Sequence, residues 1–262
     1  MHGTTGIKTR CDFGVVTLLM VASSVTPGFA QPGRRLESPA NRSLVVIVQV
    51  KPEMLGEWLD LQRKAVVPAL KKAGVTSRTV YSSRVFGTAF EYRIVQPLNR
   101  FADFDSGESQ AVGFGSARDD KLGAQLRKCL SGASSFLITV LPELSNPSEN
   151  KAPALIQFLR LRIADGKMRE YEEAYRSEVV PALRKAGAYV NVASRRLGTD
   201  GRDLTFETPL NSFADLDAPP ALIRSLGPEG AAKLTAKLNS LATVVENTIW
   251  VRESDLSFGA QQ

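Results

Sequence analysis

Apolar and polar residues follow two kinds of pattern along this chain: short β-prone runs, and longer stripes with helical spacing. Residues 44–50 (LVVIVQV) form an almost continuous apolar run, which predicts a strand covered on both faces. In residues 54–74 apolar side chains recur every three or four positions opposite a charged face, which predicts an amphipathic helix. Pro68 interrupts this stripe and predicts a kink or a new helix start, and Gly74 predicts a helix end.

A hairpin is expected next. Residues 75–85 and 90–95 are β-prone, with a turn at residues 86–88 between them. Because side chains in a strand alternate between its faces, the second of these strands should separate two sets of residues. Phe90, Tyr92 and Ile94 are expected on one face, and Glu91, Arg93 and Val95 on the other.

Two further elements complete this unit. Asn99 is placed to cap a short helix, and a glycine-rich passage follows at residues 106–115. Residues 117–130 then predict a helix, and residues 136–141 (FLITVL) a fourth strand. The Val112-Gly-Phe-Gly-Ser stretch in the glycine-rich passage lacks the lysine of a phosphate-binding loop, so an ordinary loop is the default interpretation.

The whole pattern occurs twice. Residues 66–74 (VVPALKKAG) return as residues 179–187 (VVPALRKAG), and residues 97–105 (PLNRFADFD) return as 209–217 (PLNSFADLD). These offsets, 113 and 112 residues, are those of a small domain rather than of a solenoid repeat. The chain therefore contains two copies of one domain.

The second copy repeats the order strand, helix, strand, strand, helix, strand. This order predicts an α+β protein made of two tandem ferredoxin-like (βαββαβ) domains with antiparallel sheets. Its strands are expected at residues 155–163, 189–196, 204–207 and 248–252, and its helices at residues 167–186 and 229–241. The expected domains are residues 43–145 and 154–257, joined by a linker at residues 146–153.

The N-terminus has the pattern of a secretory signal peptide over residues 1–30. Lys8 and Arg10 precede an apolar run at residues 13–25, and small residues follow a helix breaker before Ala30. The run is shorter than the roughly 20 residues of a spanning helix, so a stable membrane anchor is the less favoured interpretation. We expect cleavage near Ala30, a flexible leader at residues 31–42, and a secreted or periplasmic protein.

Composition narrows the possible chemistry. The chain has one histidine and two cysteines, and cleavage would remove His2 and Cys11. Without histidine, a Ser-His-Asp triad, a histidine-ligated zinc site and a histidine-ligated haem are excluded, and no metal or cofactor is expected. Cys129 aligns with Leu241 and is interpreted as a small buried hydrophobe. The net charge is +6, but the lysines and arginines are interleaved with aspartates and glutamates along the chain. This pattern indicates solvated faces rather than nucleic-acid binding.

The strand, the following turn and helix, and the Val-Pro-Ala-Leu-Lys/Arg-Lys-Ala-Gly stretch resemble the dimeric α+β barrel superfamily. Within it the resemblance is to NIPSNAP-like and antibiotic-biosynthesis-monooxygenase-like domains. Members usually pair two such domains, sheet against sheet, into a barrel. The resemblance implies that this chain forms that barrel within itself, as a monomer with an internal pseudo-dimer or as a homodimer. It says little about function, because one fold supports many activities.

Four aromatic residues are candidate ligand contacts. Trp58 and its counterpart Tyr171 lie on the apolar stripes of the two long helices. Tyr81 and Tyr92 lie on predicted strands, where their hydroxyl groups could enter a ligand site. Each of the four is also explained as an ordinary core aromatic, packed between helix and sheet.

Polar candidates occur on the hairpin strands. Arg84 is aligned with Arg195, because Gly-Thr follows each within a few residues, and Glu91 is aligned with Asp203. Such arginines and carboxylates could bind an anionic ligand or accept a proton, or they could form cross-strand ion pairs. Asn191, a polar residue in a strand, could orient a carbonyl group or face solvent.

Three functions remain open from the sequence. The first is an exported protein that binds a small apolar or aromatic ligand inside the barrel without chemistry. The second, implied by the resemblance, is a cofactor-free monooxygenase-like enzyme acting on a small aromatic or polyketide-like substrate. The third is a structural or protein-interaction module. No catalytic residue is assigned, and a barrel filled by its own side chains would contradict both ligand hypotheses.

Overall fold

A computed structural model of the protein describes residues 41–105, 121–149 and 153–259. The expected signal peptide, all but the last two residues of the expected leader, and the glycine-rich passage lie outside the described residues. The described residues belong to one compact unit.

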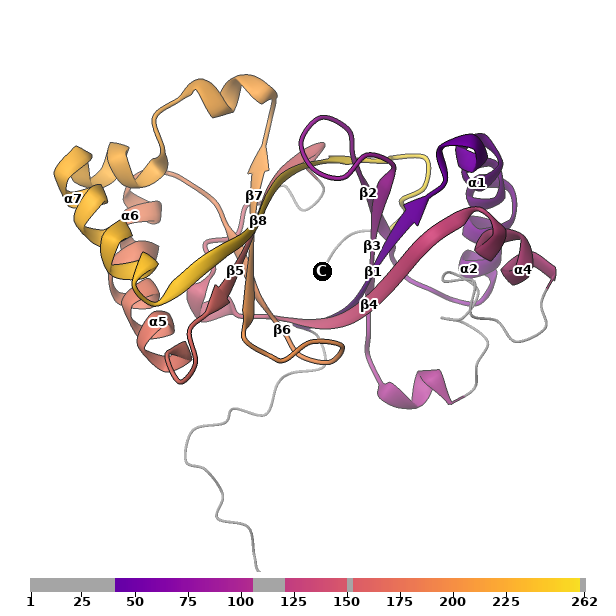
Figure 1. The fold of residues 1–262 in the computed structure, drawn as a ribbon, viewed down its shortest axis with the longest axis horizontal. Coiled ribbons are helices and arrows are strands. Elements are labelled where there is room, and N and C mark those ends of the chain that lie inside the picture. Colours follow the sequence, from indigo (N-terminus) through magenta and orange to yellow (C-terminus); the bar gives the residue numbers. More distant parts are fainter. Residues whose placement is uncertain (1–40, 106–120, 150–152, 260–262) are drawn as a thin grey trace, which may run out of the picture. The chain divides into compact units, whose positions relative to one another are not determined.

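Eight antiparallel strands form a closed barrel, with helices outside it on two opposite sides (Figure 1). The order around the barrel is β1-β3-β2-β8-β5-β7-β6-β4. This confirms an α+β protein built on a closed barrel. The first half of the barrel comprises β1 (Arg42–Val50), β2 (Thr79–Ser83), β3 (Glu91–Pro97) and β4 (Leu130–Val140); the second comprises β5 (Leu155–Ile163), β6 (Asn191–Arg195), β7 (Asp203–Leu210) and β8 (Ala242–Arg252).

The two halves use the same strand order, β4-β1-β3-β2 and β8-β5-β7-β6. They join where β2 pairs with β8 and where β4 pairs with β6. Each half alone would expose two edge strands, and closure pairs all four of these edges. The barrel is thus completed by one chain.

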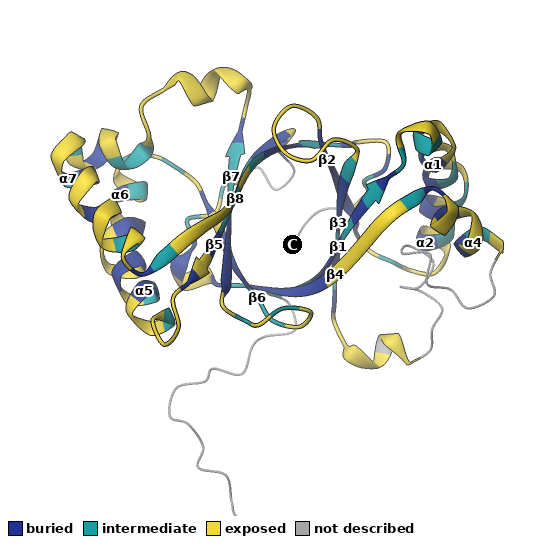
Figure 2. Cartoon of the chain, in the orientation of Figure 1, coloured by how far each residue is buried: buried dark blue, intermediate teal, exposed yellow. Residues whose placement is uncertain are grey.

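The helices and short turns lie outside the barrel, with their buried faces toward the sheet (Figure 2). Within the described residues, none of the helices combines the length and apolar character needed to cross a bilayer. The α-helices are α1 (Leu55–Leu61), α2 (Val67–Lys72), α4 (Lys121–Lys128), α5 (Met168–Ala174), α6 (Val180–Lys185) and α7 (Ala221–Asn239). The 3-10 segments are η2 (Pro52–Met54), η4 (Phe101–Phe104), η5 (Pro142–Leu144) and η7 (Phe213–Asp217), and the π-helical segments are η3 (Gln62–Val66) and η6 (Tyr175–Val179).

The repeated VVPAL stretch forms a widened turn rather than a sharp break. In a regular α-helix the Pro68 ring would clash with the carbonyl group four residues earlier. The preceding turn is π-helical instead: the Val67 amide donates to the Gln62 carbonyl oxygen, five residues back, and α2 begins at Val67. The second copy does the same, with the Val180 amide donating to Tyr175.

The predicted glycine stop is confirmed in both copies. Gly74 and Gly187 have φ values of +79° and +63°, which favour glycine. The Val75 amide donates to the Leu70 carbonyl and the Gly74 amide to the Lys71 carbonyl, which is the Schellman arrangement.

Other boundaries differ from expectation. Asn99 is not a helix cap, because η4 begins after Arg100 and no side chain caps it. β4 begins at Leu130 rather than at residue 136, and β8 at Ala242 rather than at residue 248. The first residues of both strands are largely exposed, so they carry no hydrophobic pattern; their pairing with β1 and β5 defines them. α7 begins at Ala221 and breaks at Gly227, where φ is +73°.

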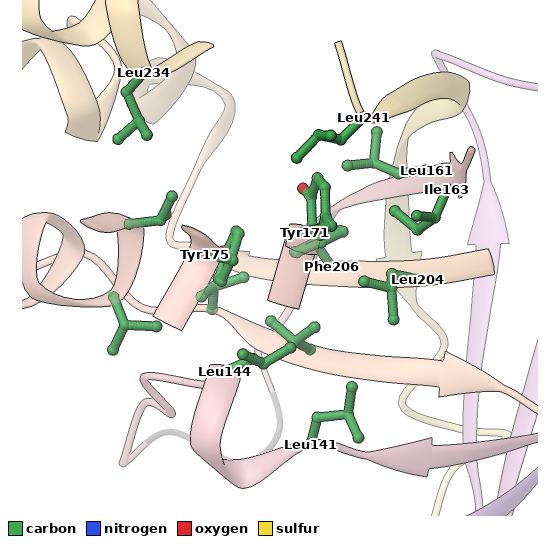
Figure 3. Close-up of a cluster of buried hydrophobic side chains, with 14 residues drawn as sticks. Leu141, Leu144, Leu161, Ile163, Tyr171, Tyr175, Leu204, Phe206, Leu234 and Leu241 are labelled. Carbon is green, nitrogen blue, oxygen red and sulfur yellow. The ribbon is translucent and has the colours of Figure 1, made fainter. Parts of the chain in front are cut away.

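Each half packs its helices on its own strands to form a core. The first core contains Leu44, Val46, Val48, Val50, Trp58, Val66, Leu70, Val80, Tyr92, Ile94, Leu126, Cys129 and Leu256. The second core contains Leu141, Leu144, Leu161, Ile163, Tyr171, Tyr175, Val179, Val180, Val190, Val192, Leu204, Phe206, Leu234 and Leu241 (Figure 3).

The halves exchange the segments that follow their last strands. Leu144, which follows β4 of the first half, is 1% exposed in the second core, and Leu256, which follows β8, is 0% exposed in the first core. Beside them, the Ser145 hydroxyl accepts from the Val192 amide and the Ser257 hydroxyl accepts from the Val80 amide. Each half therefore supplies part of the core of the other.

Candidate functional site

Inward-facing side chains of the eight strands line the lumen of the barrel. β3 shows the predicted alternation from Glu91 onward: Tyr92 and Ile94 belong to the first core, whereas Glu91 and Arg93 face a cavity in the lumen. Phe90, expected on the core face, instead precedes the strand with a φ of +60° and is exposed. The run at residues 44–50 is apolar on both faces for a related reason. One face of this strand contacts the helices, and the other faces the lumen, where it packs with residues of the opposite half.

The cavity has a volume of about 490 Å³, which is within the usual range for a small-molecule site. The hairpins β2–β3 and β6–β7 lie at the same end of the barrel, since β2 and β6 run in the same direction, and both contribute to the cavity wall. The wall combines ionisable groups with aromatic rings. These are Glu91, Arg93, Arg160, Arg195 and Glu246 on the one hand, and Phe136, Phe158 and Trp250 on the other.

Apolar side chains fill the lumen beyond the cavity. Tyr81, Ile156, Phe158 and Trp250 form one cluster, and Val45, Phe136, Ile138 and Ala193 form another. Phe136, Phe158 and Trp250 thus belong both to these clusters and to the cavity wall. The lumen is therefore partly filled by its own side chains and partly hollow.

Arg93 crosses the lumen. Its side chain is 1% exposed, and its Nη2 lies 2.6 Å from Glu207 Oε1 on β7, the strand opposite β3 in the barrel. The contact is an ion pair by distance but lacks the alignment of a hydrogen bond, so the Nη2 atom, like Nε and Nη1, has no hydrogen-bond partner among the described residues. The guanidinium group also lies over the Phe158 ring, 4.5 Å from its centroid.

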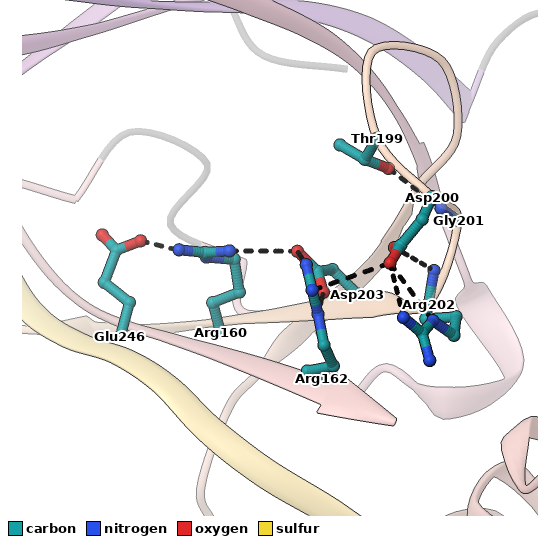
Figure 4. Close-up of polar contacts among 8 residues, drawn as sticks. All are labelled: Arg160, Arg162, Thr199, Asp200, Gly201, Arg202, Asp203 and Glu246. Atoms are coloured by element: carbon teal, nitrogen blue, oxygen red, sulfur yellow. Dashed lines mark hydrogen bonds and ion pairs between the residues drawn. The ribbon is translucent and has the colours of Figure 1, made fainter. Parts of the chain in front are cut away.

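The second half holds a connected set of charges (Figure 4). Arg160 donates to Asp203 at 3.0 Å and to Glu246 at 3.3 Å, and Arg162 donates to Asp203 at 2.9 Å. Burial alone would raise the pKa of Asp203, but the hydrogen bonds from Arg162 and Arg160 outweigh it and hold this pKa below its usual range. These charges are therefore compensated by one another.

Glu91 lacks such a partner. In the strand register it lies opposite Gln49, whereas its counterpart Asp203 lies opposite Arg162. No ion pair to Glu91 occurs among the described residues. Burial, and to a smaller extent the nearby Glu246 carboxylate, raise the pKa of Glu91 above its usual range, against a hydrogen bond from Thr88.

Arg195 is the cavity cation without a carboxylate in ion-pair distance among the described residues. Its guanidinium carbon lies 3.7 Å from the centroid of the Phe136 ring, and its Nε is buried without a hydrogen-bond partner there. Burial, together with repulsion from Arg160 and Arg93, lowers the pKa of Arg195 to about 10. It remains a cation at neutral pH.

The eight candidate residues fall in different places. Glu91 and Arg195 line the cavity, and Tyr81 packs beside it in the cluster with Trp250. Trp58 and Tyr92, with ring centroids 4.4 Å apart, lie in the first core, and Tyr171 lies in the second. Asn191 is exposed on β6, and Arg84 pairs with Glu253 at 2.7 Å.

The alignment of Arg84 with Arg195 is wrong by one residue. Ser82 pairs with Tyr92 as Ser194 pairs with Leu204, so Arg195 corresponds to Ser83 and Arg84 to Arg196. A shift of one residue moves a strand side chain to the other face. For this reason Arg84 turns away from Glu91 and pairs with Glu253 instead. Asp203 pairs with Arg160 and Arg162 rather than with Arg195.

Several wall residues were missed at the level of sequence. Arg93 and Arg160 each stand within an apolar, β-prone run, and a charged residue at such a position was the available signal. Phe136, Phe158 and Trp250 look like ordinary core residues, and Glu246 stands in a stretch that was not recognised as part of a strand. Nothing in the local pattern distinguishes them.

Comparison with known proteins identifies the fold. No family model and no curated protein matches the chain. An anthrone oxidase-like protein has a TM-score of 0.54 at 11% identity, over 84% of this chain and 94% of its own. A candidate monooxygenase from Lactobacillus acidophilus has a TM-score of 0.50 at 6% identity, over 84% of this chain and 96% of its own. One from Fusobacterium nucleatum has a TM-score of 0.51 at 10% identity, over 81% of this chain and 91% of its own. At these identities the likeness shows a shared fold alone.

Proposed function

We propose that the protein binds a small aromatic molecule in the barrel cavity, without chemistry. The observation that carries this proposal is the cavity itself, about 490 Å³ in size and walled by Phe136, Phe158 and Trp250. A planar ring can pack against these side chains, and burial of its apolar surface supplies the driving force. The guanidinium groups of Arg93 and Arg195, each lying over a ring of the wall, supply polar contacts.

A second candidate is a cofactor-free monooxygenase-like enzyme. Glu91 favours it, because a carboxylate with a raised pKa in a cavity can accept a proton from a substrate C–H group that is acidified by a neighbouring carbonyl group. Dioxygen would be the oxidant: the methylene group becomes a carbonyl group, one oxygen atom enters the product, and the other leaves as water with the two hydrogens. The names of the fold neighbours support this candidate by analogy only.

We also infer that the two halves are duplicated ferredoxin-like domains, related to the NIPSNAP-like and antibiotic-biosynthesis-monooxygenase-like groups, and that the chain is exported after cleavage near Ala30. The sequence repeat and the matching strand orders support the duplication. The charge and apolar pattern of residues 1–30 supports export. Because one chain closes the barrel, the ligand site needs no second chain.

Binding is tested with 2-naphthol, a neutral bicyclic aromatic probe, followed through quenching of Trp250 fluorescence in a Trp58→Phe background. We expect saturable quenching, because Trp250 lines the cavity. Ser134→Trp should abolish it by filling the cavity, whereas Ser131→Trp on the same strand, away from the wall, should not. Quenching that survives Ser134→Trp would contradict the proposal.

The two candidates are separated with anthrone as the probe substrate. Binding without oxygen uptake supports the binding protein. Oxygen uptake that the parent protein catalyses and Glu91→Gln loses supports the enzyme. Native mass spectrometry of the gently extracted protein would then identify the natural ligand.

A further inference from the structure

The buried polar atoms of the cavity wall that lack hydrogen-bond partners are of one kind. Arg93 Nε and Nη1, Arg195 Nε and Trp250 Nε1 are each buried without a partner among the described residues. Arg93 and Trp250 are both 1% exposed, and all three residues line the cavity. Each of these atoms is an N–H donor, since neither guanidinium nor indole accepts hydrogen bonds.

Buried donors without partners are costly. Leaving a buried donor unsatisfied costs about 1–3 kcal/mol, and more for a charged group. A cluster of several on one wall therefore indicates a missing acceptor. Because the unpaired groups are all donors, a ligand that satisfies them must present oxygen acceptors rather than donors.

The ion pairs of the wall place this acceptor beside Arg195, and the wall carboxylates favour a single negative charge on it. Arg160 already has Asp203 and Glu246, and Arg93 has Glu207 on the opposite strand. Arg195 has no carboxylate in ion-pair distance among the described residues, so it is the wall cation left to bind an acceptor. Glu91 on the same wall also lacks an ion pair there, so contact with Arg195, and not a net charge of the wall, locates the acceptor. Glu91 and Glu246 on the same wall would repel a dianion more strongly than a monoanion.

The two halves differ at corresponding positions of the wall, so the negative charge of the ligand can be bound on one side of the cavity only. The cross-strand pair Ile47 and Ser134 of the first half corresponds to Arg160 and Glu246 of the second. At the hairpin, Ser83 of the first half corresponds to Arg195 of the second. A ligand in the lumen therefore meets a cation without an ion pair among the described residues on one side of the cavity only.

We propose that the ligand is an aromatic carboxylate, whose carboxylate group is bound by Arg195 together with Arg93 and Trp250 while its ring packs against Phe136 and Phe158. This inference rests on the proposed function, because it assigns the ligand class of the same cavity. A carboxylate offers two oxygens to guanidinium donors. The arginine-on-ring contacts at Phe136 and Phe158 hold these donors beside the apolar wall that receives the ring.

The test compares 2-naphthoate with 2-naphthamide, which has the same ring but no charge, by Trp250 fluorescence quenching in the Trp58→Phe background. We expect 2-naphthoate to bind about 10- to 100-fold more tightly, the range of a charge-assisted hydrogen bond. Arg195→Gln should weaken naphthoate binding by a similar factor and leave naphthamide binding nearly unchanged. Arg195→Lys should recover part of the loss.

Arg84→Gln is the matched control, because this arginine lies on the hairpin one residue out of register and pairs with Glu253 away from the cavity. It should change neither affinity. Equal affinities for the two probes, or an equal loss of both in Arg195→Gln, would overturn the inference while the proposed function stands. Binding of neither probe, nor of 2-naphthol, would overturn both. Unchanged melting curves of the variants show that they are folded.

Discussion

At the scale of single residues, the charged groups of the barrel differ in whether an oppositely charged partner lies beside them. Asp203 and Glu91 occupy corresponding positions, but Asp203 faces Arg162 across the strands and Glu91 faces Gln49. Their pKa values consequently shift in opposite directions, that of Asp203 downward and that of Glu91 upward. The same position is a structural ion pair in one half and a candidate ligand or proton-accepting group in the other.

Glu91 should therefore destabilise the folded protein at neutral pH. The unfolded chain releases this proton near pH 4.3, below the raised folded pKa, so rising pH through this window favours unfolding. The cost is fully present above the folded pKa and absent below about pH 4. We expect Glu91→Gln to raise the free energy of unfolding at pH 7.5 and to give no gain at pH 3.5, measured by urea denaturation.

Glu207→Gln provides the opposite control. It removes the partner of the buried Arg93, so it should lower the free energy of unfolding at pH 7.5, by about 1–3 kcal/mol. A gain for Glu91→Gln of the same size at both pH values would show that charge is not its cause.

At the scale of elements, the hairpins after β2 and β6 are held against the opposite half. Gly198 has a φ of +81°, and a Cβ atom there would lie 2.5 Å from the Ser135 carbonyl oxygen on β4. The neighbouring backbone bonds tie the same hairpin to β4, through Leu137 N–H to the Leu197 carbonyl and Arg196 N–H to the Leu137 carbonyl. Backbone contact with β4 thus fixes a hairpin that lines the cavity.

Gly198→Ala should accordingly destabilise the protein by about 3 kcal/mol or more, from the left-handed conformation and the backbone clash together. Gly201 lies in the same hairpin with a φ of +77° but has open space around it, so Gly201→Ala should cost only about 1–2 kcal/mol. The difference in unfolding free energy isolates the contact with β4. Equal costs would mean that this contact is unimportant.

At the scale of the whole molecule, the two halves share cores as well as strands. Leu144 completes the second core and Leu256 completes the first, and two strand junctions close the barrel. A change in either core is expected to act on both halves, because neither core is complete without a segment from the other half. The protein should unfold as one cooperative unit.

Leu144→Ala tests this cooperativity. The lost side chain and the resulting cavity in the second core should cost about 2–5 kcal/mol. Trp58 in the first core and Trp250 in the barrel serve as separate reporters in the Trp250→Phe and Trp58→Phe backgrounds. Both urea transitions should shift by the same free energy. A shift of the Trp250 transition alone would show that the halves unfold independently.

Much of the fold could be predicted from local pattern. The β-prone runs at 44–50 and 155–163, the helix end at Gly74 and the repeat itself all follow from residue type and spacing, because they depend on neighbours in the chain. The exposed beginnings of β4 and β8 could not be recognised, since only their pairing with β1 and β5 makes them strands. The helix interruption before Pro68 was expected, but not that it is a π-helical turn.

The sequence by itself determined the internal repeat, the order of elements and the faces that residues 91–95 take. Only the tertiary structure decided which inward-facing residues share one cavity, because closure of the barrel sets strands from both halves opposite each other. A register difference of a single residue placed Arg195 in the lumen and Arg84 outside it. Local pattern orients a side chain relative to its own strand, whereas a site depends on register between strands that are far apart in the chain.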